Sequence, residues 1–166
     1  IETGEARETM HMALLLGFGA AAINPYLAFA TVAELVRTDA LSVRTNAPRA
    51  LQNYIKALNK GLMKIMSKMG ISTLRSYRNG QVFEAVGLAQ SVLDRYFTGT
   101  VSRVGGIGLD EIAREALARV ADAQRAPAAA PLPAGGQYAW RADGERHLWT
   151  AQSISALQQS TRTGDW

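Results

Sequence analysis

Four lysines at a regular spacing are the residues of this chain that most directly suggest a chemical role. They occur in the stretch NYIKALNKGLMKIMSKMGIST, which runs from residue 53 to 73, and they are Lys56, Lys60, Lys64 and Lys68. Each four-residue step advances about 40° around an α-helix, so the four side chains cover an arc of roughly 120°. Apolar side chains occupy a similar arc on nearly the opposite side, namely Leu51, Tyr54, Ile55, Leu58, Leu62, Ile65, Met66 and Met69. One helix face is therefore predicted to be buried, and the lysine face could meet water, an anion or an acidic partner.

Two further stretches carry groups that bind anions in other proteins. In MGISTLRSYR, the hydroxyls of Ser72 and Thr73 stand at a predicted helix start, where such residues usually cap, and Arg75 could hold a carboxylate or phosphate. In SRVGGIGLDE, backbone amides precede a helix start, but Asp110 would occupy the cap and repel phosphate. A flexible loop packed on a neighbour is the alternative for the second stretch. GFGAAA has the form of a dinucleotide loop, but it follows a predicted helix, which favours a turn.

Groups that could support catalysis are scarce. The chain contains no cysteine, which excludes a disulfide, a thiolate metal site and a cysteine nucleophile within it. His11 and His147 lie far apart and neither belongs to a zinc-protease pattern. No serine or carboxylate is an evident partner of His147, so a packed or hydrogen-bonded histidine is expected there. No set of residues forms a self-sufficient active site.

Composition is that of a globular protein. The chain has 166 residues, of which 48% are hydrophobic and 19% charged, with a net charge of +4. No aromatic side chains are interleaved with the lysines to stack on bases, so nucleic-acid binding is not expected. No apolar run is long enough to span a membrane, and IETGEARETM is not a signal peptide, so a cytoplasmic location is predicted. Both ends are expected to be cuts in a longer protein.

The fold class predicted from these patterns is α/β, helix-rich, with short strands and one β-hairpin. Helices are expected over residues 4–16, 28–37, 50–69, 73–86, 89–97 and 110–123 and in the final 15 or so, with Thr3 capping the first. Ile71 is a candidate for a very short strand, and residues 98–110 are expected to form a glycine-rich loop. Residues 126–136 read as a linker rich in proline and alanine. The Asp143–Gly144 pair in QYAWRADGERHLW predicts the hairpin.

Several long blocks of this sequence resemble the large subunit of glutamate synthase, in that family's order and over almost the whole chain. They are ETGEARE at 2–8, AINPYLAF at 22–29, NYIKALNKGLMKIMSKMGIST at 53–73, QVFEAVGL at 81–88, YFTGT at 96–100, RVGGIGLDEIA at 103–113 and TRTGDW at 161–166. The resemblance implies a segment of an enzyme that makes L-glutamate from L-glutamine and 2-oxoglutarate. In that family, an amidotransferase domain releases ammonia, which travels through an internal tunnel to an FMN-containing domain that reduces 2-iminoglutarate.

The same resemblance implies a division of the chain. Residues 1–48 would end the family's central domain, and residues 49–125 would form a helix-rich connection. The linker at 126–136 and a hairpin plus helix at 137–166 would then precede a (β/α)8 barrel that holds FMN. Other domains of the same polypeptide are the implied partners, together with a small NAD(P)H-oxidising subunit or ferredoxin in the full enzyme.

No principal catalytic or metal residue of the family is expected in this chain. FMN and a 3Fe-4S cluster would be held elsewhere in the full enzyme. Ser72, Thr73 and Arg75 are candidates to lie near the domain seam and shape a flavin or tunnel wall, and the four lysines are candidates to face another domain. One alternative is a stand-alone basic helical module that binds an acidic protein or nucleic acid. Another is a truncated gene product that does not fold alone.

Overall fold

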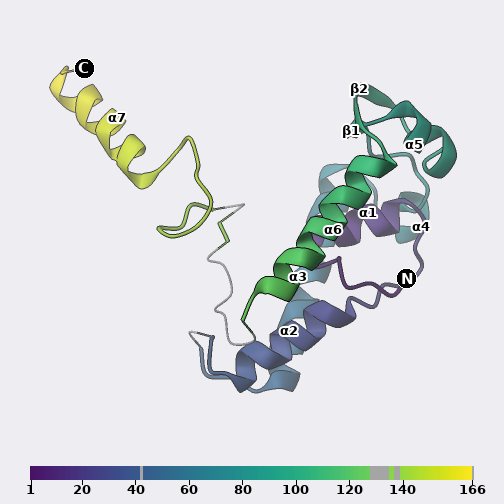
Figure 1. The fold of residues 1–166 in the computed structure, drawn as a ribbon, viewed down its shortest axis with the longest axis horizontal. Coiled ribbons are helices and arrows are strands. Elements are labelled where there is room, and N and C mark those ends of the chain that lie inside the picture. The colour runs from purple at the N-terminus through teal and green to yellow at the C-terminus, as the bar shows by residue number, and fades with distance from the viewer. Residues whose placement is uncertain (42, 128–134, 137–138, 166) are drawn as a thin grey trace. The chain divides into compact units, whose positions relative to one another are not determined.

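The computed structural model describes residues 1–41, 43–127, 135–136 and 139–165 (Figure 1). The chain divides into two compact units, residues 1–113 and 114–166. The first unit contains α1 (Thr9–Gly17), α2 (Tyr26–Arg37), α3 (Ala47–Lys68), α4 (Leu74–Tyr77), β1 (Ala85–Leu88), α5 (Gln90–Tyr96) and β2 (Ser102–Ile107). Helix α6 (Leu109–Arg125) begins in the first unit and continues into the second, which also contains α7 (Ala151–Thr163). The predicted helix-rich α/β class is confirmed.

Helix α1 forms the centre of the first unit. It packs against α3, and α2 packs against α3 in turn. Met12, Ala13 and Leu16 of α1 are buried, as are Tyr77 and Leu93 from later in the chain. The helix begins at Thr9 and not at residue 4, because the Nδ1 of His11 accepts the backbone N–H of Glu8 at 3.2 Å and fixes the start there. The predicted cap at Thr3 is therefore wrong.

The long lysine-bearing helix forms close to where the sequence predicted it. Asn46 caps α3 by accepting the backbone N–H of Arg49 at 3.0 Å, and Pro48 stands in the first turn, where its missing N–H costs nothing. Gly70, with φ +73°, follows the last turn in the left-handed conformation that suits a helix end. The helices predicted over residues 28–37 and 89–97 likewise correspond closely to α2 and α5.

Two expectations between α3 and α6 are wrong. The helix expected over 73–86 ends at Tyr77, because Asn79 and Gln81 adopt left-handed backbone conformations with φ of 57° and 50°. The loop expected over 98–110 contains β2, which pairs in parallel with β1 through Ala85–Ser102, Val86–Val104 and Leu88–Ile107. Figure 1 shows the two strands side by side near α5, which connects them. Ile71 is not in a strand.

The start of α6 differs from its prediction in one respect. Asp110 lies in the first turn and does not cap the helix. Instead, the backbone N–H of Gly108 donates to the Oε2 of Glu111 at 3.0 Å. A carboxylate therefore already occupies this helix N-terminus, which the dipole favours.

The second unit contains a well-capped helix and no hairpin among its described residues. Thr150 caps α7 by accepting the backbone N–H of Ser153 at 3.1 Å. Residues 139–149 form bends and one turn, closed by the N–H of Gly144 donating to the carbonyl of Arg141 at 3.1 Å. The predicted hairpin is wrong there, because the turn centres on Ala142 and Asp143 and not on the Asp143–Gly144 pair. Most of the expected linker, together with residues 137 and 138, lies outside the described residues.

No helix in the described parts of the chain is both long and apolar enough to cross a lipid bilayer.

Candidate functional site

The packed face of α3 is held against α1 and α2 by specific contacts. The hydroxyl of Tyr54 donates to the carbonyl of Arg7 at 2.6 Å, and its ring meets that of Phe29 edge-on at a centroid distance of 6.0 Å. Burial, and secondarily the negative charge of Glu8, raises the pKa of Tyr54. At Gly61 the helices come so close that an added Cβ would stand 2.5 Å from the γ atoms of Thr9. These contacts fix which side of α3 faces outward.

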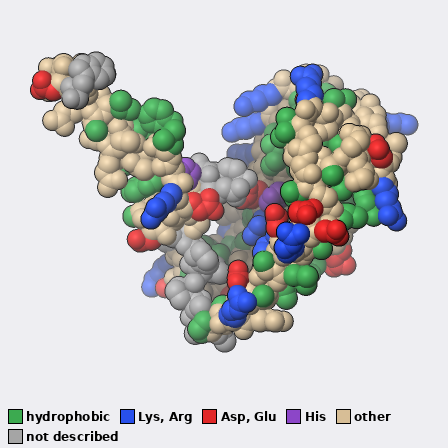
Figure 2. All heavy atoms as spheres, turned by 45° about the horizontal axis from the view of Figure 1, so that its top comes forward, with side chains coloured by type: hydrophobic (Ala, Val, Ile, Leu, Met, Phe, Trp, Pro, Cys, Tyr) green, Lys and Arg blue, Asp and Glu red, His purple; other side chains and the backbone are tan. Residues whose placement is uncertain are grey.

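The four lysines lie on the outward side of α3, and all are exposed. Among the residues that the structure describes, no carboxylate lies within ion-pair distance of Lys56, Lys60, Lys64 or Lys68. One exposed apolar side chain, Met63 at 71% exposure, lies beside the row. Figure 2 shows that Lys and Arg side chains project from several parts of the surface of the first unit, so the basic charge is distributed on this view.

The structure gives different surroundings to the candidates Ser72, Thr73 and Arg75. Thr73 caps α4, since its Oγ1 accepts the backbone N–H of Ser76 at 3.3 Å and bonds the Ser76 hydroxyl at 2.9 Å. Ser72 and Arg75 are exposed. A domain seam near these residues stays a prediction.

The segment that follows α4 is anchored to the end of α1. The hydroxyl of Tyr77, whose side chain is fully buried, donates to the carbonyl of Ala13 at 2.8 Å, and burial raises the pKa of Tyr77. The Nη2 of Arg78 donates to the carbonyl of Gly19, and the backbone N–H of Asn79 donates to that of Gly17, both at 2.8 Å. The bond from Asn79 satisfies the carbonyl of Gly17, which the end of α1 leaves open. These bonds also place residues 79–83 beside Phe18.

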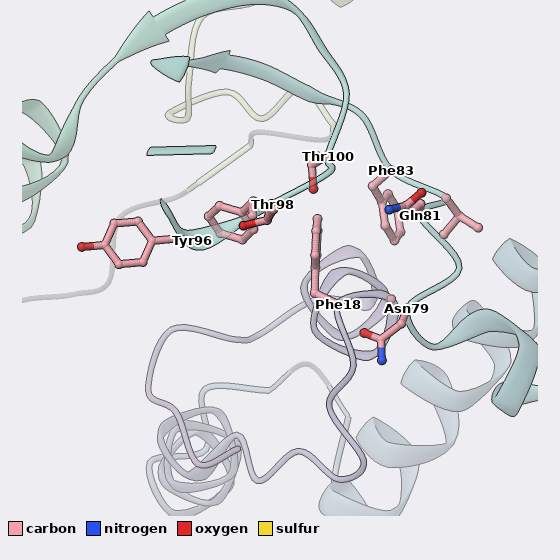
Figure 3. Close-up of a pocket in the computed structure, with 10 residues that line it drawn as sticks. Phe18, Asn79, Gln81, Phe83, Tyr96, Thr98 and Thr100 are labelled. Carbon is pink, nitrogen blue, oxygen red and sulfur yellow. The ribbon is translucent and has the colours of Figure 1, made fainter. Parts of the chain in front are cut away.

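A pocket of about 210 Å³ lies between the end of α1, residues 79–83 and the loop after α5. Phe18 stands at its centre, between Phe83 on one side and Thr98 and Thr100 on the other (Figure 3). Its ring meets that of Phe97 edge-on at a centroid distance of 5.2 Å and lies nearly parallel to that of Phe83 at 6.2 Å. The amides of Asn79 and Gln81 complete the lining with Tyr96, whose phenol is the only ionisable group.

This pocket can hold a neutral group, but its lining offers no general base or activated nucleophile. In the described parts of the chain, no group of three or more His, Asp or Glu residues is placed to bind a metal ion. The Nε2 of His147 lies 2.5 Å from the carbonyl of Gly136, in agreement with the expected hydrogen-bonded histidine.

Sequence reasoning missed the pocket because its members come from three separate stretches. The Asn79–Gly80 pair is the one local signal that could have drawn attention to it. Asparagine tolerates the left-handed conformation, so Asn–Gly is a common turn dipeptide. GFGAAA, which supplies Gly17 and Phe18, is a helix end followed by a turn at Gly19, whose φ is +105°. It does not follow a strand, as a dinucleotide loop would.

The sequence of this chain matches known proteins of one family. The family model for the glutamate synthase central domain matches residues 1–89. The large chain of NADPH glutamate synthase from Bacillus subtilis is 45% identical over 166 residues, which is the whole of this chain and 11% of that protein. NADH glutamate synthase from Schizosaccharomyces pombe is 40% identical over 97% of this chain and 8% of its own length. Ferredoxin-dependent glutamate synthase from Antithamnion sp. is 40% identical over 99% of this chain and 11% of its own length.

The chain thus spans about a tenth of the length of the curated relatives it matches. The family model extends through residue 89, beyond residue 48, where we expected the central domain to end. The internal boundaries at 48, 125 and 136 stay predictions. The alternative of a stand-alone basic module finds no support among these relatives. The chain belongs to the glutamate synthase family, and its match to that family's central domain covers residues 1–89.

Proposed function

We propose that this chain is a structural segment of a glutamate synthase that makes L-glutamate from L-glutamine and 2-oxoglutarate. In this proposal, other domains release ammonia from glutamine and reduce 2-iminoglutarate, and this segment connects them without supplying catalytic residues. The family match supports the proposal. A small NAD(P)H-oxidising subunit or ferredoxin would bring electrons to the full enzyme.

The cofactors of the full enzyme would be held by other parts of the polypeptide. A 3Fe-4S cluster needs thiolate ligands, and this chain has no cysteine, so its residues do not fit the cluster. FMN would supply the hydride for the reduction, and its phosphate would need a site such as an open helix N-terminus. The N-terminus of α6, which follows Gly108, does not fit a phosphate group, because the carboxylate of Glu111 already accepts the N–H of Gly108.

The structural role that we propose is contact between domains through the lysine face of α3. The observation that supports it is a row of four exposed ammonium groups without a carboxylate partner among the described residues, on the helix side away from α1 and α2. Like charges at this spacing destabilise an isolated helix, so the four lysines lower the stability of α3 itself. Carboxylates on another domain would offset that cost. Four such pairs at about 0.2–1 kcal/mol each would contribute about 1–4 kcal/mol to the contact.

The test compares two variants of the full-length enzyme in which Lys56, Lys60, Lys64 and Lys68 are all replaced. Lysine to glutamine removes the four charges, whereas lysine to arginine keeps them and serves as the matched control. We expect the glutamine variant to form less glutamate per glutamine hydrolysed, with a loss that approaches zero at high salt, where the parent enzyme is also weakened. The arginine variant should couple the two reactions as the parent does.

Amine labelling gives a second measurement on the parent enzyme. We expect the four lysines to be acylated more slowly in the full-length protein than after unfolding in urea. Unchanged coupling in the glutamine variant, together with labelling at the rate of free surface lysines, would show that the row faces solvent and would refute the contact.

A further inference from the structure

The pocket around Phe18 has a strained rim. Among the described residues, three that are not glycine have a left-handed backbone, namely Asp39, Asn79 and Gln81. Two of the three, Asn79 and Gln81, line this pocket. Asparagine and aspartate tolerate the conformation, but glutamine is not among the residues enriched in it. Backbone strain of this kind clusters at functional sites, so the side chains at positions 79 and 81 become candidates for a binding role.

The amides of Asn79 and Gln81 are held against two glycines and have free hydrogen-bonding capacity. A Cβ at Gly19 would stand 2.6 Å from the Oδ1 of Asn79, and one at Gly99 would stand 3.0 Å from the Nε2 of Gln81. Figure 3 shows both side chains among those around Phe18. Within the described part of the chain, neither amide has a hydrogen-bond partner. Each amide offers two donors and an acceptor, so the pocket presents both kinds of group.

The walls of the pocket are aromatic and uncharged. The side chains of Phe18 and Tyr96 are 43% and 51% exposed, and the rings of Phe83 and Phe97 contact that of Phe18. Aromatic faces favour a flat partner, because ring stacking stabilises beyond the area that it buries. No lining side chain carries a charge, so an ionised group would lose hydration here without gaining an ion pair. The preferred ligand is therefore neutral and flat.

The volume of the pocket limits the size of that ligand. It is about 210 Å³, and a cavity of about 150 Å³ holds benzene in another protein. There is room for one substituted ring or two fused rings. Asparagine and glutamine amides pair with adenine by donating to a ring nitrogen and accepting from the amino group. The lining thus has both elements that recognise such a ring, namely stacking faces and amides.

We propose that the Phe18 pocket binds a neutral heteroaromatic ring of one or two rings whose edge carries a hydrogen-bond donor beside an acceptor, as a purine base does. All of the lining residues belong to the first unit, so the geometry does not depend on where the second unit lies. The inference goes beyond the proposed function and does not rest on it. It assigns a ligand site and no chemical step.

The experiment measures the binding of adenosine to the full-length protein by equilibrium dialysis. We expect saturable binding with a dissociation constant on the order of 0.1 mM, from the affinity per atom that ligands of this size reach. The comparison probe is 1-methylindole, which is flat and has two fused rings but no hydrogen-bond donor. It should bind about tenfold more weakly. Equal affinity for the two probes would refute recognition by the amides.

Glycine substitutions locate the site. Asn79→Gly and Gln81→Gly remove the amides, and glycine adopts the left-handed backbone readily. Each should weaken adenosine about fivefold to tenfold, the value of one hydrogen bond, and leave 1-methylindole unchanged. Asp39→Gly is the matched control, because it makes the same backbone change outside this pocket and should alter neither affinity. Asn79→Asp keeps the shape and removes the donors, so it should also weaken adenosine without loosening the backbone.

Three results would overturn the proposal. The first is an absence of saturable adenosine binding, which includes the case in which another part of the polypeptide fills the pocket. The second is unchanged adenosine binding in both Asn79→Gly and Gln81→Gly, which would place the ligand elsewhere. The third is an equal loss in Asp39→Gly, which would attribute the effect to the backbone. Binding requires no turnover, so none of these results depends on whether the lysine face couples the two reactions.

Discussion

Replacement of Gly61 by alanine should destabilise the chain, although alanine is the better helix former. In the middle of an exposed helix, the change would gain about 1 kcal/mol from propensity. Here the new Cβ would stand 2.5 Å from both γ atoms of Thr9 and 3.1 Å from its Cβ. Threonine is stiff at χ1 on a helix, so the γ atoms cannot both turn away. Overpacking of this kind costs about 1–3 kcal/mol, which leaves a net loss of about 1 kcal/mol.

A second variant shows whether the close contact causes the loss. Thr9→Ala removes the two γ atoms and leaves only the 3.1 Å contact, which a shift of a few tenths of an ångström relieves. In the Thr9→Ala background, Gly61→Ala should therefore stabilise the chain by about 0.5–1 kcal/mol, since the propensity gain is then unopposed. The effect of one substitution changes sign with the other, a coupling of about 1–2 kcal/mol.

Urea-induced unfolding, followed by far-UV circular dichroism, measures all four proteins of this cycle. The helix-rich fold gives a large signal, and the slope of the transition reports whether the variants unfold from equally compact states. If Gly61→Ala alone raised the free energy of unfolding, α1 and α3 would not cross closely at this point. The account of how α3 is oriented would then be wrong.

Two further predictions concern α4 and its surroundings. Tyr77→Phe should cost about 1 kcal/mol, because the buried hydrogen bond from its hydroxyl to the carbonyl of Ala13 is lost. Burial raises the pKa of Tyr77, so the phenol keeps its proton to higher pH in the folded state than in the unfolded state. The stability of the folded state should therefore be intact below about pH 10 and fall as the pH rises through the folded pKa. Urea titrations across that range should show a gentler fall in Tyr77→Phe. Thr73→Ala should cost about 1 kcal/mol through loss of the cap, whereas Ser72→Ala, the matched exposed control, should stay within about 0.5 kcal/mol. Equal losses in thermal unfolding of these two variants would contradict the assignment of the cap to Thr73.

The elements that the sequence predicted best are those whose stability is local. Helix α3 has a period of apolar residues, a capping asparagine and a glycine after its end, and all three signals agree. The early end of α4 was not predictable in this way. Arg78 and Asn79 are held by hydrogen bonds to the carbonyls of Gly19 and Gly17, which lie about 60 residues earlier in the chain. Tertiary contacts override the helical pattern of residues 78–86.

Strands β1 and β2 escaped prediction for a related reason. Each is short, and between them they contain Gly87, Gly105 and Gly106, which weaken the strand signal. Their partnership is parallel and requires the crossover through α5, so no turn dipeptide marks it. The structure explains why position 106 is a glycine: a Cβ there would stand 2.2 Å from the carbonyl oxygen of Gly87 on the paired strand.

The two unpartnered surfaces of the first unit make different physical demands. Helix α3 is amphipathic, so its lysine face is stable in water and gains from a partner without requiring one. The sheet has no such polar face at Val86 and Val104, and a parallel pair depends on cover. Loss of the lysine charges should therefore alter communication between domains more than stability. The two surfaces can therefore be distinguished in one protein by measuring coupling and stability side by side.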